Sequence, residues 1–173
     1  MPIREIRVLG DPVLRQEATQ IASFDPALKE LVRDLFETMY HAQGVGLAAP
    51  QIGVSTRVFV VDVRDSEDEP GGHYALVNPV IVEFSKATER SPEGCLSIPG
   101  LEDVVERAAA VVLEAVDPDG DPVRIEATGL LSRALQHELD HLDGVLFPDR
   151  VTPLKRRLLL KKWKKLQAEE AAS

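Results

Sequence analysis

The chain has 173 residues, 44% of them hydrophobic and 28% charged, so it can bury a core as a single domain, and we expect one domain over residues 1–173. Its formal net charge is −9, but the segment 155–165 holds seven basic residues and no acidic one. The remaining 162 residues therefore carry 13 basic and 29 acidic side chains, a charge of −16. This balance excludes nucleic-acid binding by bulk charge outside the basic segment, and no DNA partner is expected.

The cysteine count and the hydropathy pattern bear on the compartment. A single cysteine, Cys95, makes an intramolecular disulfide impossible. The opening MPIREIRVLGDPVL lacks the apolar core of a signal peptide, and no apolar run reaches the roughly 18 residues of a membrane span. We therefore expect a cytoplasmic, monomeric protein without a membrane partner.

The first regular element in chain order is a helix. Residues 1–23 are mixed in pattern and are expected to be extended and irregular. Asp25 followed by Pro26 predicts a helix start, because aspartate caps helix N-termini and proline is tolerated at the first helical position. Apolar residues then recur with helical spacing as far as Tyr40, which predicts a helix with one buried face that ends before Gly44.

The stretch GVGLAAPQ, residues 44–51, is too rich in glycine and proline for a regular element. One interpretation is a loop whose backbone amides and Gln51 side chain face a ligand. The other is a tight connection into the next strand, and the composition by itself does not separate the two.

Two strands are expected after this loop. Residues 57–63 read RVFVVDV, which predicts a strand, and the acidic stretch 64–72 predicts an exposed loop. A second strand is expected from about residue 74 to 84. Asn78 and Pro79 interrupt it, so we expect an edge position or a bulge there.

A hairpin and a helix follow. Residues 104–116 and 122–127 are expected to be strands on either side of a turn with the sequence Asp-Pro-Asp-Gly. Thr128 or Gly129 is expected to begin the next helix, and Gly144 to end it in the position that favours a left-handed backbone.

This helix carries the motif with the clearest chemistry. At about 100° per residue, His137 and His141 lie one turn apart on the same face, so both imidazoles can bind one cation. Glu138 lies beside them and can take a proton from a metal-bound water. The pattern HExxH is that of zinc hydrolases, whereas the competing interpretation is two histidines satisfied within an apolar core.

Two histidines do not complete a catalytic site, because such centres use three protein ligands and an open position. In the longer HExxHxxGxxH pattern the third ligand would stand at position 147, which is Phe147, and the segment 153–168 contains no acidic residue. His41, His73 and Cys95 remain as candidates, and we interpret the two histidines as surface residues.

Cys95 lies in SPEGCLSIPG, residues 91–100, where proline and glycine exclude a helix. A lone cysteine is commonly an inert small hydrophobe, but a thiolate is also a strong ligand for soft divalent metals. Both interpretations of Cys95 remain open on this evidence.

The last predicted element is a helix from about residue 153 to 171, with leucines and Trp163 near one face and the basic segment on the other. A solvated helix packed through its leucine stripe and a binding surface both fit this pattern.

Three stretches together, GVGLAAPQ at 44–51, EGCLS at 93–97 and QHELDH at 136–141, resemble the three signature motifs of the peptide deformylase family, in the same order and at similar separations. The resemblance extends over nearly the whole chain. It includes the opening GDPVL, the pair Asn78 and Pro79, and the GLL that begins the metal helix.

The resemblance implies a metal-dependent hydrolase that removes the formyl group from the N-terminal formylmethionine of nascent polypeptides and releases formate. It implies Fe(II) as the ion, with zinc, nickel or cobalt as possible substitutes, and a metal-bound water as the nucleophile. The implied metal ligands are Cys95, His137 and His141, and Glu138 is the implied general acid/base.

The resemblance also implies the substrate contacts. The formyl oxygen would be bound by the Gln51 side chain and the backbone amide of Leu96, and the substrate backbone by Gly46. An apolar pocket for the methionine side chain is expected nearby, and the residues that we expect to line it are Val45, Leu130 and Ala134.

The expected fold class is α+β, with antiparallel sheets partly wrapping a central buried metal-binding helix between an N-terminal and a C-terminal helix. In some members of the family the basic C-terminal helix docks on the ribosome, so residues 155–171 are a candidate ribosome contact. A zincin-like peptidase and a structural metal module are the alternatives; the first lacks a downstream ligand, and the second has no use for Glu138.

Overall fold

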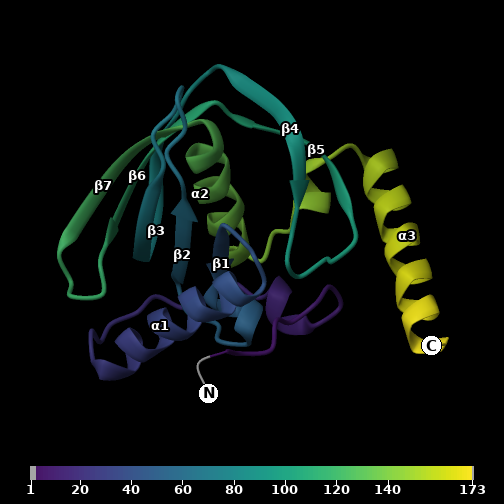
Figure 1. The fold of residues 1–173 in the computed structure, drawn as a ribbon, viewed down its shortest axis with the longest axis horizontal. Coiled ribbons are helices and arrows are strands. Elements are labelled where there is room, and N and C mark those ends of the chain that lie inside the picture. The colour runs from purple at the N-terminus through teal and green to yellow at the C-terminus, as the bar shows by residue number, and fades with distance from the viewer. Residues whose placement is uncertain (1–2, 173) are drawn as a thin grey trace.

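The computed structural model describes residues 3–172 (Figure 1). Its helices and strands are α1 (Pro26–His41), β1 (Gly46–Ala48), β2 (Val58–Val63), β3 (Gly72–Phe84), β4 (Thr88–Gly94), β5 (Glu102–Ala108), β6 (Ala110–Val116), β7 (Pro122–Thr128), α2 (Gly129–Leu142) and α3 (Pro153–Ala172). Three short 3-10 helices accompany them, η1 (Pro12–Arg15), η2 (Ala49–Ile52) and η3 (Phe147–Arg150).

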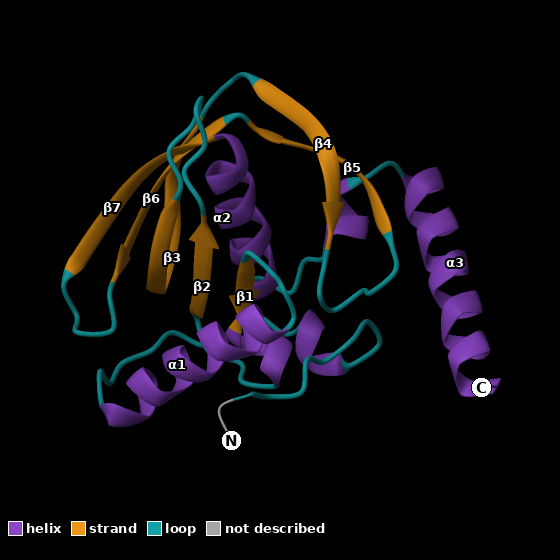
Figure 2. Cartoon of the chain, in the orientation of Figure 1, coloured by secondary structure: helices purple, strands orange, loops and turns teal. Residues whose placement is uncertain are grey.

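The strands form two antiparallel sheets. One has five strands in the order β1-β2-β3-β6-β7, and the other consists of β4 and β5 alone. Helix α2 lies between them, while α1 and α3 lie on the outside (Figure 2). The predicted α+β fold, with a central helix partly wrapped by antiparallel sheets, is confirmed.

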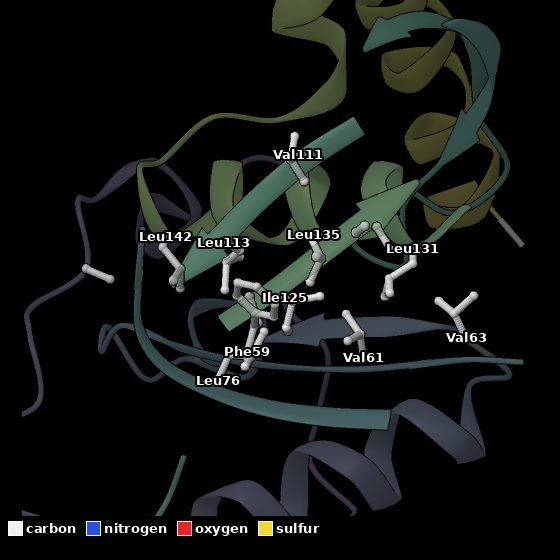
Figure 3. Packing of buried hydrophobic residues seen from close by; sticks show 14 residues of the cluster. Phe59, Val61, Val63, Leu76, Val111, Leu113, Ile125, Leu131, Leu135 and Leu142 are labelled. Atoms are coloured by element: carbon white, nitrogen blue, oxygen red, sulfur yellow. The ribbon is translucent and has the colours of Figure 1, made fainter. Parts of the chain in front are cut away.

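Helix α2 is buried because it is covered on more than one side. Ten of its 14 residues are buried, and they include charged as well as apolar side chains. Figure 3 shows Leu131, Leu135 and Leu142 facing the side chains of the five-stranded sheet. The strand residues that pack in this cluster include Phe59, Val61, Leu76, Val111, Leu113 and Ile125.

Strand β2 is covered on both faces along residues 58–61, which explains the run of four apolar residues there. Phe59 and Val61 face α2, whereas Val58 and Val60 pack in a second cluster with the apolar face of α1. Alternate residues of a strand point to opposite faces of the sheet, so a strand covered by a helix on each face needs apolar residues at every position.

The third apolar cluster lies between the two-stranded sheet and α3. It joins Ile98, Leu101 and Val105, which lie in or next to the two-stranded sheet, to Leu159 and Trp163 of α3. Helix α3 is therefore packed through Leu159, Trp163 and Leu166, as one of the two interpretations predicted, whereas Leu154 and Leu158 of the same predicted stripe are exposed. Most of its basic side chains lie at the surface.

The predicted helix boundaries agree with the structure. The Asp25 carboxylate accepts a hydrogen bond from the Leu28 N–H (3.1 Å) and caps α1. Thr128 holds the cap position of α2, although its hydroxyl makes no capping bond, and Gly144 follows the helix with a positive φ of 74°. None of the helices within residues 3–172 has the length and apolar character needed to cross a bilayer.

Asn78 and Pro79 form a bulge in β3, as predicted, but the edge alternative is wrong. Strand β3 lies between β2 and β6, and its register shifts between Val77 and Val80. Asn78 adopts a φ of 51°, and its side chain bonds the backbone N–H and carbonyl of Ile21, both at 2.9 Å. These bonds stabilise the interruption inside the sheet.

The prediction of one strand over residues 104–116 is wrong, because the chain changes sheets at Ala109. Strand β5 pairs with β4, whereas β6 pairs with β3 and β7 around the predicted turn. At the crossing, the Gln136 side chain of α2 donates to the Ala108 carbonyl (2.9 Å) and accepts from its N–H (3.2 Å). A side chain from a remote helix thus satisfies the backbone where the two sheets part.

Regular structure also occurs in the stretch 44–51, interpreted as a loop or a tight connection, and at residues 88–94, where no element was predicted. The stretch 44–51 includes β1, paired with β2, and most of η2, and residues 88–94 form β4. Strand β4 is largely exposed and lacks apolar alternation, so its sequence carries no strand signal. His41 and His73 are both exposed, as expected, but His73 lies in β3, stacked on Phe36 with ring centroids 4.5 Å apart, and not in a loop.

Replacement of Leu135, which is fully buried between α2 and the five-stranded sheet, tests this packing. We expect Leu135→Ala to lower the free energy of unfolding by about 2–5 kcal/mol, because the cavity is surrounded by fixed strands. Leu154→Ala, a matched change at a leucine of α3 that is 62% exposed, should change it by less than about 0.5 kcal/mol. Urea unfolding measures both, and equal losses would contradict the prediction.

Candidate metal centre

The three expected metal ligands meet at one point. The ligand atoms of Cys95, His137 and His141 all lie within 4.8 Å of one another. The His141 Nε2 is 3.3 Å from the Cys95 Sγ and 3.2 Å from the His137 Nε2. Bonds of about 2.0–2.3 Å to a tetrahedral ion place ligands about 3.3–3.6 Å apart, so the three donors fit a divalent metal.

Two different elements supply these ligands. The histidines come from one face of α2, and Cys95 directly follows the last residue of β4. A turn holds the cysteine, since the Ile98 N–H donates to the Cys95 carbonyl (2.9 Å) and Ile98 is fully buried in the third apolar cluster. His41 and His73, the other candidates, are not part of the centre.

Glu138 is buried beside the ligands without a partner. Its Oε1 has no hydrogen-bond partner among the described residues, and burial raises the pKa of its carboxyl to about 7. Gly46 faces it, because a Cβ built there would lie 2.6 Å from the Glu138 Oε2. A buried carboxylate oxygen that no protein group satisfies needs a ligand or a solvent molecule, as a hydrolytic centre would provide.

Glu93 orients the first histidine. Its Oε1 lies 2.8 Å from the His137 Nδ1, which leaves Nε2 directed toward the other two ligands. Burial alone would raise the pKa of Glu93, but bonds from Arg107 and His137 hold it well below its usual range. A carboxylate that fixes the second ring nitrogen is a common support of metal-binding histidines.

The two imidazoles have opposite shifts in the absence of an ion. Burial would lower the pKa of His137, but hydrogen bonds to Cys95 and Glu93 raise it well above its usual range. Burial, and next the charge of His137, lowers the pKa of His141 well below its usual range. The lowered pKa of His141 favours its neutral form, which is the form that can bind a metal.

Arginines neutralise the buried carboxylates around this centre. Arg107 donates to both Glu93 oxygens (2.8 and 2.9 Å) and to the Asp140 Oδ2 (2.6 Å). Arg150 of η3 binds Asp140 from the other side (2.7 Å), and Arg133 binds Glu93 (2.6 Å). Sequence reasoning missed this network, although an arginine within the apolar pattern of residues 104–116 was a usable signal.

Two hydrogen-bond donors lie next to the cysteine. Gln51 is 1% exposed, and its Oε1 accepts from the Ala48 N–H (2.9 Å), which fixes the amide. Its Nε2 is 3.0 Å from the Ser97 Oγ and 3.7 Å from the Cys95 Sγ. The Leu96 N–H has no acceptor within residues 3–172. Both expected donors therefore lie at the centre.

A cavity of about 420 Å³ opens onto the centre. Val45 and Leu130 form exposed parts of its rim, at 44% and 54% exposure, and the buried Ala134 forms part of its wall. The other predicted site residues that line it are Gly46, Gln51, Cys95, Leu96, His137 and Glu138; His141 is not part of the lining but lies next to Cys95 and His137. The structure thus brings together every residue that the sequence predicted for the site.

A Cys–His–His centre beside an open cavity, with an unpaired carboxylate next to it, defines a metal-dependent hydrolase. It fits neither two satisfied core histidines nor a closed structural metal site.

Comparison with known proteins identifies the family. The family model described as polypeptide deformylase matches residues 3–157, and the chain belongs to this family. It is 45% identical over 172 residues to a peptide deformylase of Brucella suis, covering 99% of this chain and 98% of the relative.

Solved structures of peptide deformylases have the same fold as this chain. A peptide deformylase from Legionella pneumophila superposes with a TM-score of 0.89 at 44% identity, covering 99% of each chain. A Met-Ala-Ser-bound class I type b peptide deformylase from Acinetobacter baumannii gives 0.81 at 34% identity, over 86% of this chain and 98% of that one. The resemblance inferred from the three motifs is confirmed.

The raised pKa of Glu138 predicts that the free energy of unfolding of the metal-free protein depends on pH. Between pH about 4.5 and about 7 the unfolded chain loses this proton while the folded chain keeps it, so the free energy of unfolding falls over that range and then levels off. We expect metal-free Glu138→Gln to lack this loss. At pH 8 its free energy of unfolding should exceed that of wild type by an amount on the order of 3 kcal/mol.

Urea unfolding in a chelator at about pH 5 and pH 8 measures this difference. The exposed Glu126→Gln on β7 serves as the control and should follow wild type at both pH values. A stability difference between Glu138→Gln and wild type that does not grow from pH 5 to pH 8 would refute the prediction.

Proposed function

We propose that this protein hydrolyses the N-terminal formyl group of formylmethionyl nascent peptides and releases formate. The observation that carries the proposal is Glu138, a buried carboxyl with a pKa of about 7 and an unpartnered oxygen beside a Cys–His–His centre. Membership of the polypeptide deformylase family supports it, as does the Met-Ala-Ser-bound relative from Acinetobacter baumannii.

Cys95, His137 and His141 would hold the ion, which we propose to be Fe(II) in the cell, with zinc, nickel or cobalt able to replace it. A bound divalent ion lowers the pKa of a coordinated water and polarises the substrate carbonyl. The thiolate favours a soft divalent metal, and both iron and Cys95 are oxidisable, so the enzyme should be sensitive to oxygen.

Glu138 moves the proton. Its unpartnered Oε1 accepts a proton from the attacking water and then delivers it to the nitrogen of the leaving amine. A pKa near 7 suits both steps, because the carboxylate and the acid are both populated at neutral pH.

The formyl oxygen would be bound by the Gln51 Nε2 and the Leu96 N–H as it becomes negative. Gln51 is held in place by its bond from Ala48, so its amide need not reorganise during the reaction. The Leu96 N–H is free to donate, since no protein acceptor within the described chain occupies it.

The substrate backbone would lie along β1. Within residues 3–172 this strand pairs with β2 alone and lies at the edge of its sheet, so the other edge at Gly46 can pair with an extended peptide. The methionine side chain would enter the cavity between Val45, Leu130 and Ala134. Because a Cβ at Gly46 would meet Glu138, only glycine lets the two lie this close.

We propose that the protein works as a monomer in the cytoplasm and that α3 contacts the ribosome. The exposed lysines Lys161, Lys162, Lys164 and Lys165 of α3 support a contact with an anionic surface. Lys155 and Arg156 approach Asp103 (3.7 Å) and Asp149 (3.2 Å) within the chain, and Arg157 is also exposed.

Activity on a formylated peptide tests the main proposal. Anaerobically iron-loaded protein should release formate from formyl-Met-Ala-Ser, and Glu138→Ala should reduce the rate by about 10²–10⁴ because the proton carrier is lost. Glu138→Ala should keep its bound metal, measured by elemental analysis, and Glu126→Ala should keep both. Cleavage of internal peptide bonds without formate release would show a peptidase instead, and loss of metal or fold in Glu138→Ala would indicate a structural site.

Charge reversal on α3 tests the ribosome contact. The change of Lys161, Lys162, Lys164 and Lys165 to Glu retains Leu159 and Trp163, which pack α3 on the domain, whereas truncation would remove them. We expect ribosome cosedimentation to be lost, wild-type cosedimentation to weaken as salt rises, and tripeptide deformylation to be unchanged. Cosedimentation that the reversal leaves intact would rule the contact out.

A further inference from the structure

The metal centre joins two separately packed parts of the protein. Helix α2, which carries the histidines, packs through its leucines on the five-stranded sheet. Cys95 instead packs with the third apolar cluster, whose members include Ile98 and Val105 and the side chains of α3. Strands β4 and β5 form their own sheet and share no ladder with the other five strands. The apolar cores alone therefore leave the distance from Cys95 to the histidines weakly determined.

One side chain of α2 reaches both strands of the smaller sheet. The Arg133 Nη1 donates to the Glu93 carboxylate (2.6 Å) and to the Val105 carbonyl of β5 (2.9 Å), and its Nη2 donates to the Glu89 carbonyl of β4 (2.8 Å). Arg133 is only 8% exposed, so these bonds lie in a protected environment. It also lines the cavity at the metal centre.

We propose that Arg133 is a positioning residue that sets the separation between the Cys95 thiolate and the two histidines. It binds β4 at Glu89 and Glu93, and Cys95 directly follows the last residue of this strand. A shift of β4 along or away from α2 would therefore move the Sγ. The same shift would move Glu93, which orients His137, so one guanidinium controls both the third ligand and the support of the first.

The planar fork of arginine is needed for this role. Three acceptors in different directions, two of them backbone carbonyls, match the fixed donors of a guanidinium and not the point charge of a lysine. Arg107 also links the two parts, but it belongs to β5, and its bonds within residues 3–172 go to the side chains of Asp140 in α2 and Glu93 in its own sheet. His137 of α2 contacts only the Glu93 side chain of β4, whereas Arg133 also binds the β4 backbone at the Glu89 carbonyl.

Cobalt(II) reports on the geometry without an activity measurement. We expect Arg133→Met, which keeps the length of the side chain, to weaken the thiolate-to-cobalt charge-transfer band and to speed the loss of cobalt to a chelator by about 10–100-fold. Arg133→Lys should fall between Arg133→Met and wild type. Arg124→Met, at an exposed arginine of β7 paired with Glu114 (3.0 Å), is the matched control and should behave as wild type.

Far-UV circular dichroism and the fluorescence of Trp163, which packs in the third cluster, establish that each variant is folded. The proposal is overturned if folded Arg133→Lys and wild type show the same band and the same rate of cobalt loss, whether or not Arg133→Met folds. It rests on the metal site and not on the deformylation reaction. Failure of wild type to bind cobalt through Cys95 would refute that site instead, and formate release tests the reaction separately.

Discussion

A buried helix that carries two histidines, a glutamate and an aspartate imposes the main constraint on this structure. Each of these groups loses its hydration when α2 enters the core, and a buried polar group without a partner destabilises the fold. Asp140 is matched by Arg107 and Arg150, and His137 by Glu93. The arginines and the smaller sheet are arranged around α2 because its ionisable residues require them.

Of the four buried side-chain atoms that lack a hydrogen-bond partner within residues 3–172, two lie on α2 in residues of the site. The Glu138 Oε1 and the His141 Nδ1 are buried and unpaired. The Glu138 oxygen lies at a cavity whose walls also carry the cysteine and the two donors from Gln51 and Leu96. Neighbouring groups whose hydrogen bonds are all satisfied hold such a site rigid, while the group without a protein partner can bind substrate or solvent.

The location of the centre between two apolar clusters links catalysis to the whole fold. The histidines are fixed by the packing of α2 on the five-stranded sheet, and the cysteine by a turn anchored next to α3. An ion bound by all three would connect the two parts, so metal binding adds to the stability of the folded state. Helix α3 is consequently part of the support of Cys95 as well as a basic surface.

The sequence by itself determined the elements that depend on local pattern and the residues with distinctive chemistry. Periodicity and capping predicted α1, α2 and α3, and the HExxH spacing predicted two ligands and their carboxylate, because both follow from the geometry of a single helix. The motif around Cys95 supplied the third ligand through resemblance. The bulge at Asn78 was also readable, since proline cannot take part in a regular ladder.

Only the tertiary structure decided what depends on contacts between distant segments. It divided residues 104–116 between two sheets, placed β3 inside its sheet, and formed β4 from a polar stretch. It also assembled the ion pairs of Glu93, Arg107, Arg133 and Asp140. These ion pairs join residues 14 to 40 positions apart, and no local pattern encodes which buried charge will meet which.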